Sequence, residues 1–298
     1  MNAPKLKFGD TIGIICPSHI YVAEHYETIL STIRGHGFHI KLGANVAKCT
    51  DGYLASAEER AADLNDMVLD REVKMVLFGG GNGASEILPY IDYENIRSNP
   101  KLFSSYSDGT SILNAITSQT DLVTYYGAGT GIFNAPQPNP YDCNHFETAF
   151  ISGFESYDHG GNWLTIKSGS AKGILIGGYL SLFVHMLANR YFKYDKSKRY
   201  ILFIETHEKF NDPAEAAVFF AFLEQTEFFN QVDALIVGTY SQLPHLEYLN
   251  RLERVGEKRG IPVVYSDSFG HGECHGILPI GIVAAIDTDK KELKAIYE

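Results

Sequence analysis

A serine at position 107 stands where a short apolar segment gives way to a helical pattern, in the string SYSDG from Ser105 to Gly109. This string nearly repeats the Gly-x-Ser-x-Gly turn, on which a serine nucleophile projects from the end of a strand. The start of the following helix offers backbone amides to a developing oxyanion. Serine and aspartate are also common helix caps, so the string has a purely structural alternative. The first interpretation predicts attack by a serine hydroxyl on a carbonyl carbon.

A glycine-rich string, GGGNG from Gly79 to Gly83, follows the apolar segment Val73 to Phe78. Glycine allows the backbone to approach a ligand closely, so an amide of Gly80 or Gly81 would complete an oxyanion hole with the amide of Asp108. A dinucleotide-binding loop is a second interpretation, although the Gly-x-Gly-x-x-Gly spacing is absent. An ordinary turn between a strand and a helix is the third.

A serine hydroxyl needs a base near neutral pH, and histidine has a suitable pKa. His271 lies between two glycines just after the expected strand Val263 to Tyr265, and His275 is a weaker rival. A carboxylate must then orient the imidazole, and Glu205 is well placed at the end of the expected strand Tyr200 to Ile204. The alternative for these residues is a solvated or capping role.

A metal site is a further interpretation of the same region. His271, Cys274 and His275 would be joined by ligands from the string ETHE that begins at Glu205. Their spacing matches no closed zinc pattern, and there is no His-Glu-x-x-His helix. We therefore expect no metal and no other cofactor.

The elements that must position these residues alternate along the first part of the chain. Expected strands lie at Thr11–Ile15, Phe38–Leu42, Val73–Phe78, Leu102–Tyr106 and Leu122–Tyr126, and expected helices at Ala23–Ile33, Ser56–Leu69, Ala84–Ile91 and after Gly109 through Ile116. Such alternation is typical of a mostly parallel sheet with helices on both faces.

Strands and helices return after a stretch rich in glycine, proline and asparagine, which we interpret as a linker. The sequence thus predicts an α/β fold of two domains. An N-terminal, mostly parallel domain (1–130) would carry the nucleophile, a linker would span 131–165, and a smaller, mixed α/β domain (166–298) would carry Glu205 and His271.

Composition narrows the class of protein. The 298 residues are 45% hydrophobic and 20% charged, as in an ordinary globular protein, and the formal net charge of −11 argues against nucleic-acid binding. Four dispersed cysteines favour reduced thiols over a disulfide framework. No apolar stretch approaches the roughly 20 residues of a membrane helix. We expect a soluble, cytoplasmic protein with no membrane partner.

Six segments occur in the order and at roughly the spacing seen in one known family: FGDTIGIICPS, GGGNGASEILPYIDY, NPKLFSSYSDGTSIL, GILIGGYLSL, ILFIETHE and FGHGECHGILPIG. On these segments the chain resembles the LD-carboxypeptidase family of serine peptidases. That family includes the muropeptide LD-carboxypeptidases and the microcin C immunity peptidases. The resemblance covers nearly the whole chain.

The resemblance implies a Ser-Glu-His triad of Ser107, Glu205 and His271, the three residues already selected for their chemistry. It implies oxyanion donors at Asp108 and in the Gly80–Gly81 pair, no cofactor, and a homodimer. The implied activity is cofactor-independent hydrolysis of an amide bond in a peptidoglycan-derived muropeptide through an acyl-enzyme. An alternative is cleavage of aminoacyl-nucleotide conjugates, as in the microcin-immunity branch.

Three positions depart from the family pattern. Gly79 stands where muropeptide-cleaving members usually have arginine, Ser105 replaces the usual glycine before the Tyr-Ser-Asp string, and Tyr179 replaces the common asparagine after Gly177-Gly178. These departures leave a further alternative open, a non-catalytic binding protein on the same fold.

Overall fold

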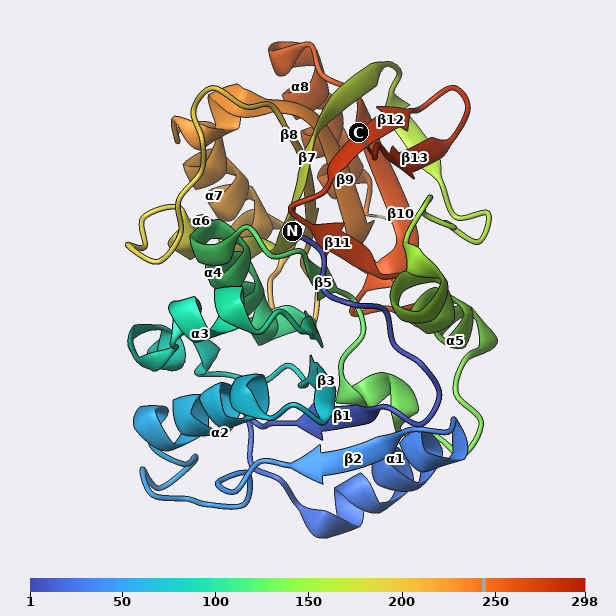
Figure 1. Cartoon of the computed structure of the whole chain (residues 1–298). Coiled ribbons are helices and arrows are strands. Elements are labelled where there is room, and N and C mark those ends of the chain that lie inside the picture. The colour runs from blue at the N-terminus through green and yellow to red at the C-terminus, as the bar shows by residue number, and fades with distance from the viewer. Residues whose placement is uncertain (243–244, 298) are drawn as a thin grey trace.

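The computed structural model describes residues 1–242 and 245–297 and contains two β-sheets with helices packed around them. Figure 1 shows the first sheet in the lower part of the molecule, with α1 (Ala23–Gly35), α2 (Ala57–Leu69) and α3 (Tyr93–Ser98) beside it. The second sheet lies above, next to α6 (Leu180–Met186), α7 (Pro213–Glu224) and α8 (Leu246–Arg259). Helix α4 (Thr110–Thr120) lies between the two sheets.

The first sheet has six strands in the order β11-β5-β4-β3-β1-β2. Its strands are β1 (Thr11–Ile14), β2 (His39–Leu42), β3 (Val73–Leu77), β4 (Leu102–Ser105), β5 (Thr124–Tyr126) and β11 (Leu278–Ile280). All neighbours are parallel except β11 and β5. The central strands β3 and β4 are almost entirely buried, as expected for a parallel sheet covered on both faces.

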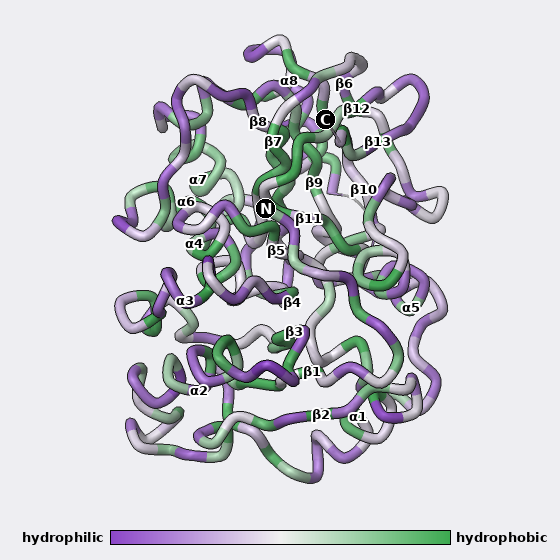
Figure 2. Tube along the Cα trace, viewed as in Figure 1, coloured by the Kyte–Doolittle hydropathy of each residue, from purple (hydrophilic) through white to green (hydrophobic). Residues whose placement is uncertain are grey.

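The second sheet has seven strands in the order β13-β12-β7-β8-β9-β10-β6. Its strands are β6 (Leu164–Lys167), β7 (Ser170–Tyr179), β8 (Tyr200–Glu205), β9 (Val232–Thr239), β10 (Val263–Gly270), β12 (Val283–Asp287) and β13 (Glu292–Ala295). The central strands β7 to β10 are parallel and the outer ones antiparallel. Figure 2 shows hydrophobic residues gathered along these central strands and hydrophilic ones on the outer loops.

The last part of the chain crosses between the sheets. Strand β10 belongs to the second sheet, but β11 pairs antiparallel with β5 in the first, with Leu278 opposite Tyr126. The segment from 271 to 277 therefore runs from one sheet to the other. Because His271 is the first residue of this crossing, the connection carries it to the boundary between the sheets.

A second close contact joins the sheets at Gly177 and Gly178 in β7. The Asn114 amide of α4 donates to the Gly177 carbonyl at 2.9 Å, and the Tyr179 amide donates to Thr110 Oγ1 at 2.8 Å. A Cβ at position 178 would lie 2.5 Å from Thr110 Oγ1, so only glycine fits against the start of α4 without displacement. This packing fixes the distance between α4 and the second sheet.

The predicted α/β class, with a mostly parallel first sheet and a mixed second one, is confirmed. The helix expected at Ala84–Ile91 is a 3-10 helix, Ala84–Tyr90, which contains Pro89. Proline supplies no backbone N–H and disfavours a regular α-helix at this position. Strand β11 has no counterpart among the expected elements.

The predicted linker contains regular structure of its own. Helix α5 (Pro140–Phe146) continues into a π-helix (Glu147–Gly153), and β6 begins at Leu164. Phe146 and Phe150 from this segment are buried in the core. The domain boundaries themselves stay a prediction.

Short 3-10 helices complete the described structure, at Ser107–Gly109, Thr130–Phe133 and Phe228–Gln231. Within residues 1–242 and 245–297, every helix falls short of the length and apolar character that crossing a membrane requires.

Candidate active site

Ser107 lies on a sharp turn between β4 and α4. Its φ of +54° is in the left-handed region, which residues with a side chain rarely adopt. The turn is held by the Thr110 hydroxyl, which donates to the Ser107 carbonyl at 2.6 Å. A strained serine between a strand and a helix is the geometry of a nucleophile elbow.

The elbow accommodates serine at position 105 because its opposite end is glycine. A Cβ on Gly109 would lie 2.2 Å from Ser105 Oγ, so a larger residue at 109 would collide with that side chain. Ser105 is fully buried, and its hydroxyl donates to the Gly79 carbonyl at 3.4 Å. The departure at Ser105 is therefore compatible with the turn.

Ser107, His271 and Glu205 form one hydrogen-bonded row. His271 Nε2 lies 3.0 Å from Ser107 Oγ, and His271 Nδ1 lies 2.9 Å from Glu205 Oε2. The carboxylate accepts a hydrogen bond from the Nδ1–H group, which leaves Nε2 as the acceptor for the serine hydroxyl. The structure thus brings together three residues that are 98 and 66 positions apart in the sequence.

The surroundings of His271 set its protonation. Burial disfavours the charged imidazolium, but the adjacent Glu205 carboxylate outweighs this effect, so the pKa of His271 is raised above 6.5. Lys209 opposes the rise from the loop that follows β8. A base in this range suits proton transfer near neutral pH.

Tyr126 connects Ser107 to Glu205 through its hydroxyl group. Its fully buried hydroxyl donates to Glu205 Oε1 at 2.5 Å and accepts a hydrogen bond from the Ser107 amide at 2.9 Å. Burial and the nearby Glu205 raise the pKa of Tyr126, so the phenol stays protonated and acts as the donor. Since the Ser107 amide is occupied, it is not available to an oxyanion.

The predicted oxyanion donors border the same space as Ser107. Gly80, Gly81 and Asp108 line a cavity with Ser107, and a Cβ on Gly80 would lie 2.7 Å from Ser107 Cβ. The Asp108 side chain accepts from the Ala84 amide at 2.6 Å and so fastens the glycine-rich loop to the elbow. Burial raises the pKa of this carboxyl above its usual range.

Arg60 holds the glycine-rich loop from its other side. The buried guanidinium donates to the Pro17 carbonyl at 2.5 Å and to the Gly83 carbonyl at 2.9 Å, and it pairs with Glu86. A buried cation is stable only when its donors are satisfied in this way. Helix α2 thereby fixes the loops that follow β1 and β3.

The cavity beside the row has a volume of about 520 Å³. It is lined by glycine-loop, elbow and second-sheet residues: Gly80, Gly81, Asn82, Tyr106, Ser107, Asp108, Tyr179, Ser181, Leu182, Phe210, Asn211 and His271. The rings of Tyr179, Phe210 and Tyr106 lie 5.2, 5.4 and 5.5 Å from the His271 ring. Phe210 is 61% exposed and stands at the entrance. Size and lining fit a small-molecule site between the two sheets.

The rival histidine has a different partner. His275 Nδ1 lies 2.9 Å from Asp142 Oδ2, and the His275 amide donates to Asp142 Oδ1 at 2.7 Å. This pair ties the crossing segment to α5. In the described part of the chain, no group of three or more His, Cys, Asp or Glu side chains is arranged to hold a metal ion.

The departures from the family pattern at Gly79 and Tyr179 are explained by their neighbours. A Cβ on Gly79 would lie 3.0 Å from Thr130 Oγ1 and 3.2 Å from the His19 ring, so neighbouring side chains already fill the space beside it. Tyr179 directs its hydroxyl to Asn211 Oδ1 at 3.0 Å.

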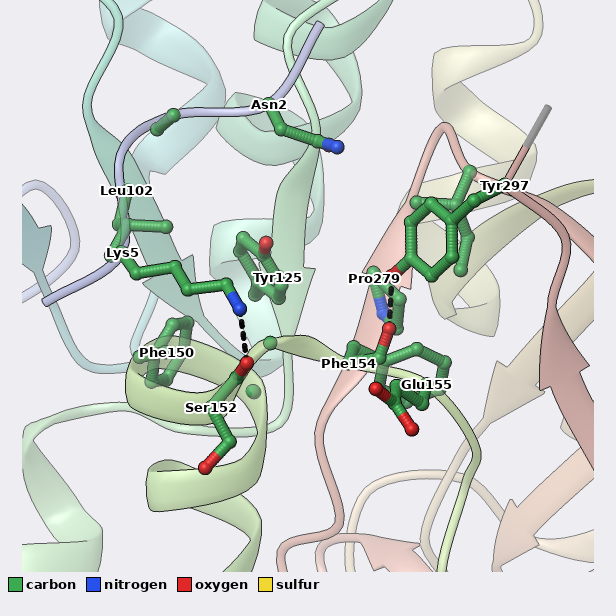
Figure 3. A pocket seen from close by; sticks show the side chains of 14 residues that line it. Asn2, Lys5, Leu102, Tyr125, Phe150, Ser152, Phe154, Glu155, Pro279 and Tyr297 are labelled. Carbon is green, nitrogen blue, oxygen red and sulfur yellow. Dashed lines mark hydrogen bonds between the residues drawn. The ribbon is translucent and has the colours of Figure 1, made fainter.

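A separate cavity of about 220 Å³ lies where the N-terminal segment, the π-helix and the C-terminal end meet (Figure 3). Lys5 donates to the Ser152 carbonyl and Tyr297 to the Phe154 carbonyl across this junction. Neither Ser107, Glu205 nor His271 lines it. The cavity beside Ser107 is therefore the candidate active site.

Sequence reasoning missed Tyr126, Phe210 and Asn211. Tyr126 carried a usable signal, because it ends a strand just before a glycine, as Glu205 ends the strand β8. Residues at the carboxyl ends of parallel strands gather at one edge of a sheet. Phe210 and Asn211 lie in an irregular loop, for which no periodic pattern exists.

The chain is similar to known proteins over most of its length. The sequence model described as the LD-carboxypeptidase N-terminal domain matches residues 12–127, and that of the LD-carboxypeptidase C-terminal domain matches residues 172–286. A probable murein peptide carboxypeptidase of Bacillus subtilis (strain 168) is 32% identical, over 96% of this chain and 91% of that protein.

The microcin C7 self-immunity protein MccF of Escherichia coli is 27% identical, over 98% of this chain and 94% of that protein. Among solved structures, an MccF-like protein from Bacillus anthracis str. Ames superposes with a TM-score of 0.89 at 26% identity, over the full length of both chains.

Proposed function

Because the chain belongs to the LD-carboxypeptidase family of serine peptidases, we propose that it hydrolyses an amide bond next to a free carboxylate in a peptidoglycan-derived muropeptide. The observation that carries this proposal is the row from Ser107 through His271 to Glu205, with contacts of 3.0 and 2.9 Å. The similarity to a probable murein peptide carboxypeptidase supports the substrate class.

In the proposed mechanism His271 Nε2 removes the proton from Ser107 Oγ as that oxygen attacks the carbonyl carbon of the substrate amide. Glu205 stabilises the imidazolium that forms. His271 then donates the proton to the leaving nitrogen, the C–N bond breaks, and an ester to Ser107 remains. Water, deprotonated by the same imidazole, hydrolyses the ester and restores the hydroxyl.

The tetrahedral oxyanion would accept hydrogen bonds from the Asp108 amide and from an amide of the Gly80–Gly81 pair. Two features support this assignment: the Ser107 amide is bound to Tyr126, and Asp108 and Arg60 both fasten the glycine-rich loop. Preorganised donors of this kind contribute about 3 to 4 kcal/mol each to transition-state stabilisation.

A second candidate is cleavage of aminoacyl-nucleotide conjugates. It is favoured by the similarity to MccF and to the MccF-like structure, and by the aromatic lining at Tyr106, Tyr179 and Phe210, which offers faces to a flat leaving group. Both candidates use the same row of catalytic residues and differ in what fills the cavity.

The decisive experiment compares hydrolysis of a muramoyl tetrapeptide and of an aminoacyl-sulfamoyl nucleotide by the parent protein and by Ser107→Ala. We expect turnover of the tetrapeptide, a loss on the order of 10⁶ in kcat on removal of the hydroxyl, and an unchanged unfolding transition. EDTA should leave turnover unchanged. Turnover by Ser107→Ala at the parent rate would refute the mechanism. If the parent protein showed no turnover, and a reagent directed at active-site serines did not label Ser107, the non-catalytic alternative would be favoured.

Two further proposals concern the state of the protein. The cysteines Cys16, Cys49, Cys143 and Cys274 are all free thiols, which supports a reducing, cytoplasmic compartment. Helix α7 supports a homodimer, because it exposes the apolar side chains Val218 and Phe222.

A further inference from the structure

Asn211 presents one face of its amide to two hydroxyl groups. Its Oδ1 accepts from the Tyr179 hydroxyl at 3.0 Å and from the Thr206 hydroxyl at 2.8 Å. Burial raises the pKa of Tyr179, which keeps this phenol a donor. An oxygen that accepts two hydrogen bonds fixes which way the amide points.

The backbone of Asn211 is held as well. Its amide donates to the His207 carbonyl at 3.0 Å, and its carbonyl accepts from the Tyr240 hydroxyl at 2.9 Å. Directly after it, Asp212 caps the N-terminus of α7. Side chain and backbone are thus preorganised by groups from three neighbouring segments, as in a binding residue.

The other end of the amide is available to a ligand. Asn211 lines the space that also borders Ser107 and His271. Within residues 1–242 and 245–297, no protein group accepts a hydrogen bond from Nδ2, and this nitrogen is not among the buried atoms without a partner. It is therefore an accessible donor with two unused protons, in a cavity whose lining contains neither lysine nor arginine.

We infer that Asn211 is a specificity-determining residue that donates from Nδ2 to a carboxylate oxygen of the substrate. This inference rests on the proposed function and adds the group that recognises the acid next to the scissile bond. A fixed neutral amide can satisfy such an oxygen without the desolvation cost of a buried cation. The field of Lys209, which already acts on His271, favours an anion over a neutral group there.

The test uses binding, so that it stands apart from catalysis. In the Ser107→Ala background, calorimetry measures the Kd of a muramoyl tetrapeptide and of the same peptide with a C-terminal carboxamide. Asn211→Asp keeps the oxygen that faces Tyr179 and Thr206 but replaces the inward donor by a negatively charged acceptor. We expect the Kd of the carboxylate peptide to rise about 30- to 100-fold and that of the carboxamide peptide to change less than about threefold.

The matched control is Asn250→Asp, which makes the same charge change at an exposed position of α8 and should leave both Kd values unchanged. Asn211→Ala replaces the aspartate variant in the test if that variant does not fold. It should raise the Kd of the carboxylate peptide about tenfold more than the Kd of the carboxamide peptide. The inference would be overturned if the Asn211 variants changed the Kd of the two peptides equally. It would also be overturned if neither peptide bound to the Ser107→Ala protein that retains Asn211. Activity that survives Ser107→Ala would instead refute the proposed function and leave this binding comparison valid.

Discussion

Individual side chains at the site divide between those that would react and those that hold them. Ser107, His271 and Glu205 form the hydrogen-bonded row that we propose reacts, whereas Tyr126 contacts both ends of that row and does not line the cavity. The holding residue matters because the Glu205 carboxylate is fully buried and depends on protein donors for its hydrogen bonds.

Tyr126→Phe tests this holding role. Without the hydroxyl, Glu205 loses one hydrogen bond, so its negative charge acts more strongly on His271 and raises the pKa of that imidazole further. We expect kcat to fall about 10- to 100-fold and the acidic limb of the pH profile of kcat/KM to move to higher pH. Tyr125→Phe is the matched control, because it removes the neighbouring hydroxyl, which borders the other cavity. A loss of activity with an unmoved limb would mean that Tyr126 is only structural.

The raised pKa of His271 predicts the pH dependence of the parent protein. The base must be neutral to accept a proton, so activity is lost as the pH falls through a pKa above 6.5. His207 also faces His271, but burial and the His271 charge lower its pKa, so it is already neutral in this range. Initial rates measured from pH 5 to 9 should place the midpoint of the acidic loss of activity above pH 6.5. The substitution His207→Asn should leave this midpoint unchanged. A limb below pH 6 would contradict the assigned environment.

Ser107, Glu205 and His271, the three residues of the hydrogen-bonded row, could be selected from the sequence because each lies next to the end of an apolar segment, where strand ends gather. Tyr126 shares this strand-end position, but its role, like that of Asn211, does not follow from the position alone. Their importance comes from contacts with Tyr179 and Glu205, which lie 32 and 79 positions away. Such pairings exist only in the folded chain.

At the scale of elements, the site depends on how β7 meets α4. The backbone of Gly178 has a φ of +141° and lies against Thr110, the residue that also holds the elbow through the Ser107 carbonyl. Any side chain at position 178 must push on α4, the helix that follows Ser107.

Gly178→Ala should therefore impair both stability and catalysis. The positive φ and the 2.5 Å approach to Thr110 Oγ1 predict a loss of about 1 to 3 kcal/mol in the free energy of unfolding. We expect kcat to fall in the fraction that remains folded. Urea unfolding and initial rates measure the two effects. Gly35→Ala, at the end of α1 where an added Cβ meets nothing within 4 Å, should change neither by much. Parent-like rates in Gly178→Ala would show that this contact does not position Ser107.

Most strands and helices were predictable, because runs such as VKMVL and the Ser56–Glu59 capping box are strong local signals. Strand β11 was not, since the three residues LPI are too few to show a period and include a proline. Its pairing with β5 is decided by the position of the crossing segment, which is a property of the tertiary structure.

At the scale of the whole molecule, α7 is apolar on more than its buried side. Val218 is 52% exposed and Phe222 is 58% exposed, one turn apart on the same helix. Exposed large apolar side chains that gather in one place are typical of an interface.

Substituting both residues tests the proposed homodimer. We expect the parent protein to have twice the mass of one chain in light scattering, and Val218→Asp with Phe222→Asp to reduce it to a single chain. Leu69→Asp, at an exposed apolar position on α2 in the first domain, is the control and should leave the mass unchanged. A parent protein that scatters as a monomer would refute the proposal.

The late arrival of β11 has a consequence for how the protein is made. Synthesis proceeds from the N-terminus, so β5 has no neighbour on its outer side until residues 278–280 have left the ribosomal exit tunnel. His271 arrives with the same segment. A nascent chain therefore carries its serine without the partner that would activate it, and hydrolytic competence would begin only after the segment from His271 to Ile280 has also emerged.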